Sequence, residues 1–217
     1  MAITAETAPL ASAPTDAAES RVDHAFISDY VSSGAKVLDV GCEDGRLLSR
    51  LIKERGVDGR GIEISQRQVN ECVARGLFVV QGDADADLKN YPDDAFDYVI
   101  LSQTIQATKK PKEVVSELLR IGRKAIVSFP NFGHWRVRFS LLFTGRMPVT
   151  RNLPEPWYDT QNIHFCTIRD FIVMVEELGA HVEAEAAFSS KGRRLEAVEN
   201  LTLTNMFASQ AVFVLSR

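Results

Sequence analysis

The sequence has few cysteines, no excess of basic residues and no long hydrophobic run. Its three cysteines, Cys42, Cys72 and Cys166, are odd in number and form no C-x-x-C pair. Neither a disulfide framework nor a zinc cluster is indicated, so we expect no metal and a reducing, cytoplasmic environment. The net charge of −4 disfavours a general nucleic-acid binder. No apolar stretch approaches the length of a membrane span, so no membrane association is expected.

The first residues also lack the features of a targeting signal. Residues 1–18 are rich in Ala, Thr and Pro and contain no Lys or Arg. They therefore resemble neither a secretory signal nor a transit peptide. We predict a disordered tail over residues 1–19 and one α/β domain over residues 20–217, because a chain with 45% hydrophobic residues can build a single core of this size.

A strand, a tight turn and a helix near residue 40 organise the rest of the chain. The segment Lys36–Val40 is short and largely apolar, Gly41 and Gly45 follow it, and apolar residues then recur at helical spacing. Such a turn needs either a positive φ or close approach of a ligand, and the helix after it presents unpaired N–H groups. Glu63 ends a second apolar segment about 20 residues later, as a ribose-binding carboxylate requires. A glycine turn alone also occurs for steric reasons without any ligand.

Helices and strands alternate along most of the chain. After residue 129 this alternation ends, and we predict an insert or cap over residues 130–166. From Asn131 to Leu153 the insert has four arginines and no acidic residue. Large apolar side chains recur in the insert at helical spacing and predict an amphipathic helix. This helix could cover the edge of the sheet, form a docking surface or a lid over the crevice, or lie on a membrane surface. These side chains are Trp135, Phe139, Leu142 and Phe143. We expect helices over residues 20–33, 44–55, 65–76, 109–122 and 167–178, and strands over 37–40, 59–64, 77–80, 96–101, 123–129, 182–188 and 211–215.

Three sequence strings resemble the class I S-adenosylmethionine-dependent methyltransferases. They are Val37-Leu38-Asp39-Val40-Gly41-Cys42-x-Asp44-Gly45, Gly61-Ile62-Glu63 and Gln81-Gly82-Asp83. The spacing of the glycines differs from that of the NAD-type fingerprint. The resemblance implies a Rossmann-like α/β fold: a mostly parallel seven-stranded sheet with its last strand antiparallel, and helices on both faces.

The same resemblance implies a site for S-adenosylmethionine. Glu43 stands where the family usually has a third glycine, so we expect its side chain to weaken cofactor binding. Asp83 is expected to face the adenine amine; alternatively, it caps the polar stretch 85–90. The implied cofactor-binding residues are Asp39, Gly41, Cys42, Gly45, Glu63, Ile64, Asp83, Ala84 and Ser102.

Four longer strings are similar to the methionine biosynthesis protein W (MetW) family. They are Leu101-Ser102-Gln103-Thr104-x-Gln106-Ala107, Phe129-Pro130-Asn131-Phe132-Gly133-His134-Trp135, Gly145-Arg146-Met147-Pro148-Val149-Thr150 and Trp157-Tyr158-Asp159-Thr160-x-Asn162-Ile163-His164-Phe165-Cys166-Thr167. This resemblance implies a bacterial cytoplasmic protein that acts in methionine synthesis alongside homoserine O-acyltransferase.

Two functions follow from these resemblances. In the first, the protein binds S-adenosylmethionine and activates or regulates the acyltransferase, with the aromatic and cationic segment 135–151 as its docking face. In the second, it is a small-molecule methyltransferase, for which His134, Tyr158, Asp159 and His164 are weak candidates for a catalytic base. Methylation of nucleic acid is disfavoured by the net charge. The absence of an N/D-P-P-aromatic string also argues against methylation of adenine or glutamine amino groups.

Overall fold

The computed structural model describes residues 21–149, 155–195 and 200–217. The tail expected over residues 1–19 lies outside the described residues, and so do residues 150–154 of the expected insert. Among the helices of the described ranges, none is both long enough and apolar enough to cross a membrane.

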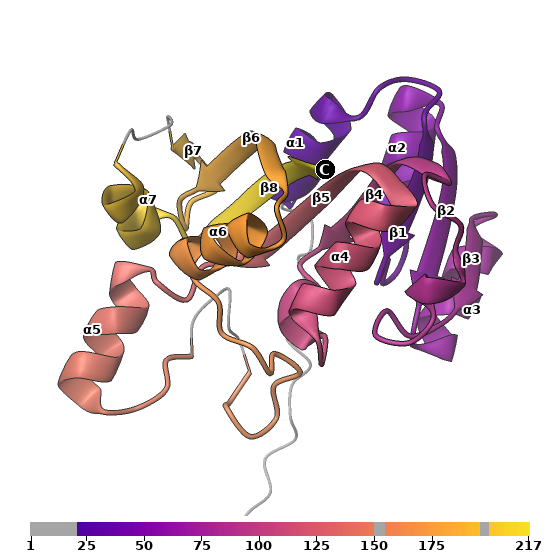
Figure 1. The fold of residues 1–217 in the computed structure, drawn as a ribbon. Coiled ribbons are helices and arrows are strands. Elements are labelled where there is room, and N and C mark those ends of the chain that lie inside the picture. Colours follow the sequence, from indigo (N-terminus) through magenta and orange to yellow (C-terminus); the bar gives the residue numbers. More distant parts are fainter. Residues whose placement is uncertain (1–20, 150–154, 196–199) are drawn as a thin grey trace, which may run out of the picture.

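One twisted sheet of eight strands forms the centre of the molecule (Figure 1). Its order is β3-β2-β1-β4-β5-β8-β6-β7, and β1, β2, β3, β4 and β5 pair in parallel. β8 pairs antiparallel with both β5 and β6, which confirms the antiparallel closing strand. The strands are β1 (Lys36–Val40), β2 (Asp58–Glu63), β3 (Phe78–Gln81), β4 (Phe96–Ser102), β5 (Gly122–Pro130), β6 (His181–Phe188), β7 (Arg194–Leu195) and β8 (Gln210–Ser216).

The prediction of seven strands was wrong by one. The additional strand, β7, has two residues and pairs antiparallel with the end of β6. A left-handed Gly192 (φ 74°) lies in the turn between them. Two residues are too few to show the alternation by which a strand is recognised in a sequence.

Helices cover both faces of the sheet, as expected (Figure 1). On one face, α4 and α6 pack on a large cluster that includes Leu118 and Phe171. On the other face, α1 and α2 pack on a second cluster that includes Ile27 and Leu51. The helices are α1 (Val22–Tyr30), α2 (Arg46–Arg55), α3 (Gln66–Ala74), α4 (Pro111–Ile121), α5 (Trp135–Thr144), α6 (Ile168–Glu177) and α7 (Leu201–Phe207), with short 3-10 turns η1 (Leu88–Asn90) and η2 (Ile105–Ala107).

Local sequence signals account for the ends of several helices. Gly56 ends α2 in the left-handed conformation (φ 62°), which glycine adopts without strain. Thr167 and Asp170 form a capping box at the start of α6. Ser65 is the N-cap residue of α3, but its side chain makes no capping hydrogen bond.

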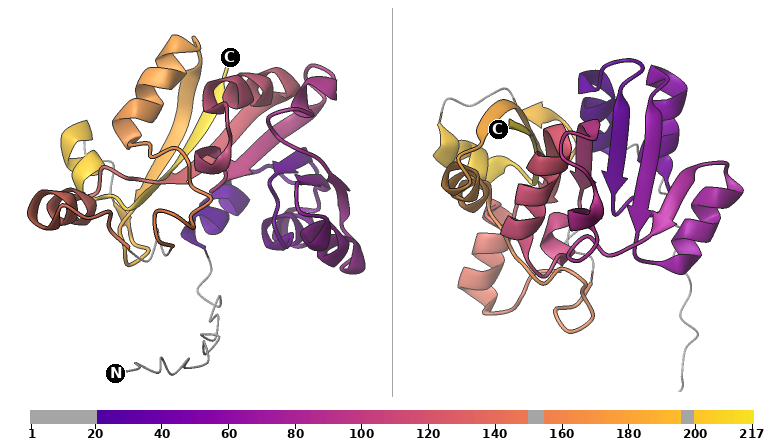
Figure 2. Two further views of the ribbon diagram at one scale, coloured as in Figure 1. Left: turned by 90° about the horizontal axis from the view of Figure 1, so that it is seen from below. Right: turned by 45° about the vertical axis from the view of Figure 1, so that its right-hand side comes forward.

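The helix of the insert, α5, stands outside the two helical layers. Figure 2 shows it beside α7, beyond the end of the sheet. Val137 is the one buried residue among its ten. α5 therefore does not cover the sheet edge as a core helix would.

Candidate functional site

The turn between β1 and α2 has the backbone geometry that its glycines predicted. Gly41 has a φ of 69° and Gly45 a φ of 75°. A Cβ atom on Gly41 would lie 2.7 Å from the Thr104 side chain, and one on Gly45 would lie 2.4 Å from Leu77. Packing within the protein thus requires glycine at both positions, and Gly45 faces the side of the turn on which α3 packs.

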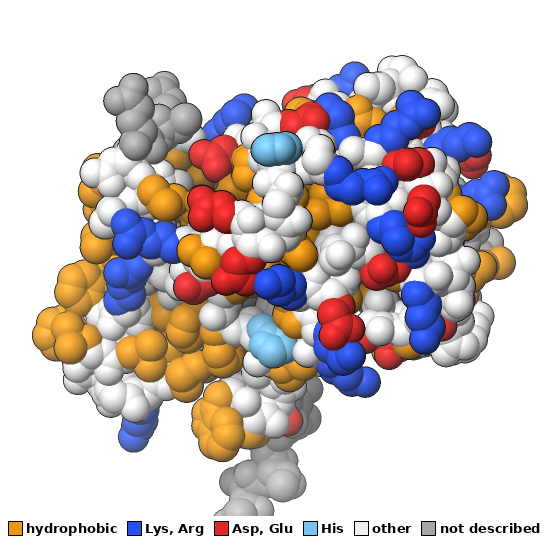
Figure 3. All heavy atoms as spheres, viewed as in Figure 1, with side chains coloured by type: hydrophobic (Ala, Val, Ile, Leu, Met, Phe, Trp, Pro, Cys, Tyr) orange, Lys and Arg blue, Asp and Glu red, His pale blue; other side chains and the backbone are white. Residues whose placement is uncertain are grey.

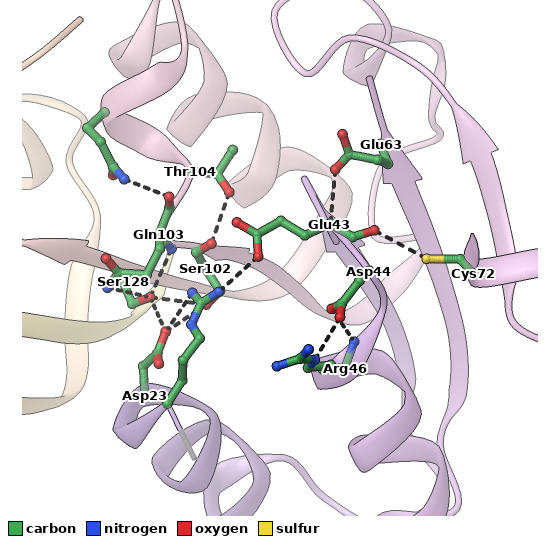
Figure 4. A network of polar contacts seen from close by, with 12 residues as sticks. Asp23, Glu43, Asp44, Arg46, Glu63, Cys72, Ser102, Gln103, Thr104 and Ser128 are labelled. Atoms are coloured by element: carbon green, nitrogen blue, oxygen red, sulfur yellow. Dashed lines mark hydrogen bonds and ion pairs between the residues drawn. The ribbon is translucent and has the colours of Figure 1, made fainter. Parts of the chain in front are cut away.

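Glu63, at the end of β2, points toward this turn (Figure 4). Its carboxylate accepts hydrogen bonds from the backbone N–H of Glu43 at 2.9 Å and from that of Ser65 at 2.9 Å. A carboxylate has about four lone-pair positions, so further acceptor capacity remains on both oxygens. Glu63 is therefore a buried acceptor held beside the glycine turn.

Two cavities meet at Gly41. The larger has a volume of about 330 Å³ and lies between α1 and the glycine turn. The smaller has a volume of about 210 Å³ and lies between the ends of β2 and β3 and the η2 segment. Gly41 lines both. Asp39, Cys42 and Ser102 line the larger cavity, whereas Ile64, Asp83 and Ala84 line the smaller one.

Arg21 crosses the larger cavity. Its guanidinium donates to Ser102 Oγ at 2.9 Å, and it forms ion pairs with Asp23 at 3.2 Å and with Glu43 at 3.3 Å. Ser102 and Ser128 in turn donate to Asp23 Oδ2 (Figure 4). Burial opposes ionisation of Asp23, but Arg21, a neighbouring histidine and these hydrogen bonds outweigh it and lower the pKa of Asp23.

Asp39 is a buried carboxylate of this cavity, and one of its two oxygens has no hydrogen-bond partner. The residue is 1% exposed, and the oxygen without a partner among the described residues is Oδ2. Burial and, to a smaller extent, the neighbouring carboxylates Glu43 and Glu63 raise the pKa of Asp39 to about 7, against the opposing attraction of Arg21. A cationic group of a ligand would remove this electrostatic penalty.

Glu43 occupies the turn at the position of the missing glycine, and it does so with a left-handed backbone (φ 49°). Such a φ is uncommon for a residue with a side chain. Its carboxylate extends toward Ser102 (Figure 4) and pairs with Arg21. Glu43 therefore ties down Arg21, one of three arginines among the described residues that line the cavity.

The two interpretations of Asp83 are compatible with each other. Its Oδ1 accepts the N–H of Asp85 at 2.9 Å, so it does cap the polar stretch. It also lines the smaller cavity beside Ala84. One carboxylate oxygen thus has a structural role, and the residue still borders the space where a ligand would lie.

None of the four weak catalytic candidates is among the described residues that line the two cavities at Gly41. His164 comes nearest by contact, because its Nε2 lies 3.4 Å from the backbone carbonyl of Lys109, which lines the smaller cavity. Tyr158 is 69% exposed, and Asp159 lies in an exposed turn. His134 and His164 instead line a separate cavity beyond β5. Burial lowers the pKa of His134.

Three residues of the site, Arg21, Asp23 and His24, escaped the sequence interpretation. None of them was among the expected site residues, but they line the larger cavity or bond to its wall. A signal existed: Asp23 lies four positions before buried Ile27 and therefore on the same helix face. A carboxylate at an inward-facing position is a reason to look for a polar site.

Solved structures share this architecture. A methyltransferase from Archaeoglobus fulgidus described as SAM dependent is similar with a TM-score of 0.64, at 16% identity, over 89% of this chain and 94% of that one. A putative methyltransferase of Haloferax volcanii, solved with the Trm112 methyltransferase activator, gives a TM-score of 0.64 at 16% identity and covers 90% of each chain. The fold is that of the class I S-adenosylmethionine-dependent methyltransferases.

The family is narrower than this class. The family model "Methionine biosynthesis protein MetW" matches residues 21–215, and the chain belongs to that family. The curated protein "Bifunctional methionine biosynthesis protein MetXA/MetW" from Rhodopirellula baltica is 33% identical over 185 residues. That match covers 81% of this chain but only 30% of the relative, so the chain spans less than a third of the relative's length.

Proposed function

We propose that this protein binds S-adenosylmethionine in the two cavities at Gly41 and regulates a homoserine O-acyltransferase of methionine biosynthesis. The observation that carries the cofactor assignment is Asp39, a buried carboxylate without a partner for Oδ2. The amino-acid end of S-adenosylmethionine bears an ammonium and a carboxylate. The negative charge of Asp39 would stabilise the ammonium, and Arg21, which lines the same cavity, would hold the carboxylate.

The nucleoside end fits the residues on the other side of Gly41. Glu63 has free acceptor capacity for ribose hydroxyl groups. Ile64 is 64% exposed at the rim of the smaller cavity, and the adenine ring would cover its side chain. Together the two cavities provide a volume within the ordinary range for ligand sites, about 300–1,000 Å³.

The positions of the polar side chains favour regulation over methyl transfer. When bound, S-adenosylmethionine supplies an electrophilic methyl group, and transfer to an acceptor with a proton needs a nearby base. None of the four base candidates lines either of the two cavities within the described residues. Methyl transfer to a small molecule is therefore the less supported function.

The partner assignment rests on two further observations. One is the printed name of the Rhodopirellula relative, which joins MetXA and MetW in one bifunctional protein. The other is the exposed apolar face of α5, on which Phe139 is 47%, Leu142 72% and Phe143 76% exposed. Figure 3 shows hydrophobic side chains gathered at the lower left, where α5 lies. Apolar patches of this kind are typical of protein interfaces.

α7 extends the same surface, because it lies beside α5 in both views (Figures 1 and 2). Its exposed apolar residues are Leu201, Leu203 and Phe207. α5 also carries Arg136 and Arg138, which would form the polar rim of such an interface. We define the α5 face as residues Trp135, Phe139, Leu142 and Phe143.

Two measurements test the two halves of the proposal. Isothermal titration of the purified protein with S-adenosylmethionine should give saturable heat. No heat and no melting shift at millimolar ligand would overturn cofactor binding. Co-expression with a homoserine O-acyltransferase should give a complex that survives gel filtration, and acyltransferase activity should respond to S-adenosylmethionine only when this protein is present. Separate elution of the two proteins would overturn the partnership.

A further inference from the structure

The carboxylate of Asp23 is the buried centre of a hydrogen-bond network behind the wall of the larger cavity. Asp23 is 1% exposed on α1, and its Oδ2 accepts hydrogen bonds from Ser102 Oγ at 2.7 Å and from Ser128 Oγ at 2.9 Å. The guanidinium of Arg21 donates to the same oxygen at 3.2 Å. One oxygen atom therefore joins α1 to β4, to β5 and to an arginine of the cavity (Figure 4).

The two serines fix the position of this carboxylate, because they are neighbours in the sheet. Ser102 and Ser128 are register partners of β4 and β5, and they are 5% and 0% exposed. Ser128 Oγ accepts the backbone N–H of Gln103 at 3.1 Å, and the shorter of its two donor contacts leads to Asp23. Hydrogen bonds to a carboxylate are stronger than those between neutral groups, so Asp23 is held firmly against the sheet.

The guanidinium of Arg21 lies at the cavity and retains donors for a ligand. It donates to Ser102 Oγ at 2.9 Å and to the Glu43 carboxylate at 3.3 Å, and both of these residues line the cavity together with Arg21. The Arg21 side chain is 33% exposed. A guanidinium has five N–H groups, and the bonds to described residues engage three of them.

The two carboxylates that pair with Arg21 act from different sides. Glu43 lines the cavity and its side chain is 55% exposed, so it competes with a ligand for the guanidinium. Asp23 is not among the described residues that line the cavity, and it bonds to the same Nη2 atom that donates to Ser102. Asp23 therefore holds the guanidinium in place without occupying the space of a ligand. An arginine without such an anchor loses more rotamer freedom when it pairs with a ligand.

We propose that Asp23 is a positioning residue that makes this site selective for adenosyl ligands with a free carboxylate. The inference rests on the function proposed above, in which Arg21 holds the carboxylate of S-adenosylmethionine. Asp23 touches no ligand. It fixes the guanidinium of Arg21 so that the remaining N–H groups meet the carboxylate of the ligand, and a ligand without that group gains nothing from the arrangement.

Isothermal titration of the full-length protein with S-adenosylmethionine and with decarboxylated S-adenosylmethionine tests this selectivity. The second ligand keeps the adenosine, the sulfonium and the ammonium and lacks only the carboxylate. The parent protein should bind S-adenosylmethionine at least about tenfold more tightly than the decarboxylated ligand, which loses the charge-assisted hydrogen bonds to Arg21. Arg21→Gln should abolish this preference.

Asp23→Asn separates positioning from a purely structural role. The amide has nearly the size of the carboxylate but no charge to anchor the guanidinium, so the preference for the carboxylated ligand should fall about three- to fivefold. The affinity for the decarboxylated ligand should change by less than about twofold. In Arg21→Gln/Asp23→Asn the preference should equal that of Arg21→Gln alone, because Asp23 acts through Arg21.

Asp29→Asn is the matched control for this substitution. It makes the same change on α1 at a side chain that is 83% exposed, and it should leave both affinities unchanged. If Asp23→Asn does not fold, Ser128→Ala removes one donor to the same oxygen and should lower the preference about twofold.

The outcomes distinguish this inference from the function on which it rests. Binding of neither ligand would overturn both. If S-adenosylmethionine binds, the inference alone is overturned by equal affinity for the decarboxylated ligand, by an equal loss of both ligands in Asp23→Asn, or by tighter binding of S-adenosylmethionine in that variant. The last result would mean that Asp23 competes for Arg21 as Glu43 does.

Discussion

The cavity beside β1 and the α5 face invert the usual distribution of side chains in opposite ways. In the cavity, charged residues are buried: Asp23 and Asp39 are each 1% exposed. On the α5 face, large apolar residues are exposed, with Phe143 at 76%. Folded proteins normally keep unpaired charges outside and collect large apolar side chains inside.

The difference between the two regions indicates which kind of binding partner each one favours. A buried carboxylate without a partner is relieved by a small cationic group, whereas an exposed apolar helix face is relieved only by a surface of comparable size. The chain therefore presents a small-molecule site and a protein-docking site in separate places. Substitutions that act on one and not on the other can test this separation.

The largest effect is expected from charges placed on the α5 face. The double variant Leu142→Glu/Phe143→Glu should lose the acyltransferase in gel filtration, because two carboxylates would have to be buried without partners. Thermal unfolding and S-adenosylmethionine binding should stay unchanged, since both side chains are exposed.

Val73→Glu is the matched control for this substitution. Val73 is 54% exposed on α3, at the opposite end of the sheet, and the variant should bind the acyltransferase normally. A double α5 variant that still co-elutes with the enzyme would show that docking occurs elsewhere.

The next largest effect is expected at Asp39. Asp39→Asn removes the charge that would stabilise the ammonium and should weaken S-adenosylmethionine by at least about thirtyfold, about 2 kcal/mol, in calorimetry. The exposed control Asp58→Asn should bind normally. Acyltransferase co-elution should persist in both variants, because neither residue lies on the α5 face.

The same variant should be more stable than the parent near pH 8. Since the folded-state pKa of Asp39 is raised to about 7, its contribution to stability falls as the pH rises from about 4 to 7. Asparagine avoids this loss but leaves an amide to satisfy, so we expect a net gain of about 1–3 kcal/mol in urea unfolding. A loss of stability would mean that Asp39 is paired in solution.

The sequence predicted the fold well because the fold depends on short-range patterns. The apolar run of β1, the left-handed Gly56 and the capping box at Thr167 each specify a local backbone state, and the structure has all three. The two-residue β7 was missed because its partner is fixed only by the turn that brings it back to β6.

The candidate site was less predictable, for a related physical reason. Gly41 and Glu63 belong to motifs with fixed spacing, whereas Arg21 reaches Ser102 across 81 positions of the chain. The unsatisfied state of Asp39 Oδ2 and Gln106 Oε1 depends on everything around each atom. No pattern along the chain records such a property.

We expect pH to have a moderate effect on the affinity for S-adenosylmethionine. Protonation of Asp39 competes with the ammonium, so affinity for S-adenosylmethionine should fall as the pH drops through the pKa of about 7. From about pH 7.5 to about pH 6 the dissociation constant should rise roughly five- to tenfold, with proton uptake on release. His24 does not titrate in this window, because burial lowers its pKa to about 4. This pH dependence of the dissociation constant should vanish in Asp39→Asn. If it persists in that variant, a group other than Asp39 causes it.

The smallest effect is expected from Glu43→Gly. Glycine adopts the left-handed backbone of this position without strain, but it also gains freedom in the unfolded chain, so stability should change by less than about 1 kcal/mol. The substitution removes the ion pair that ties Arg21 to the turn. Arg21 then keeps its bonds to Asp23 and Ser102 but loses one competing carboxylate, so it pairs more readily with the ligand carboxylate, and S-adenosylmethionine should bind a few-fold more tightly in calorimetry. Glu43→Gln keeps the side-chain length and the strained backbone while removing the charge. If Gln tightens binding as much as Gly does, the charge on Glu43 weakens the site, and if only Gly does, the bulk of the side chain is responsible. Unchanged affinity in both variants would show that Glu43 is no obstacle to the cofactor.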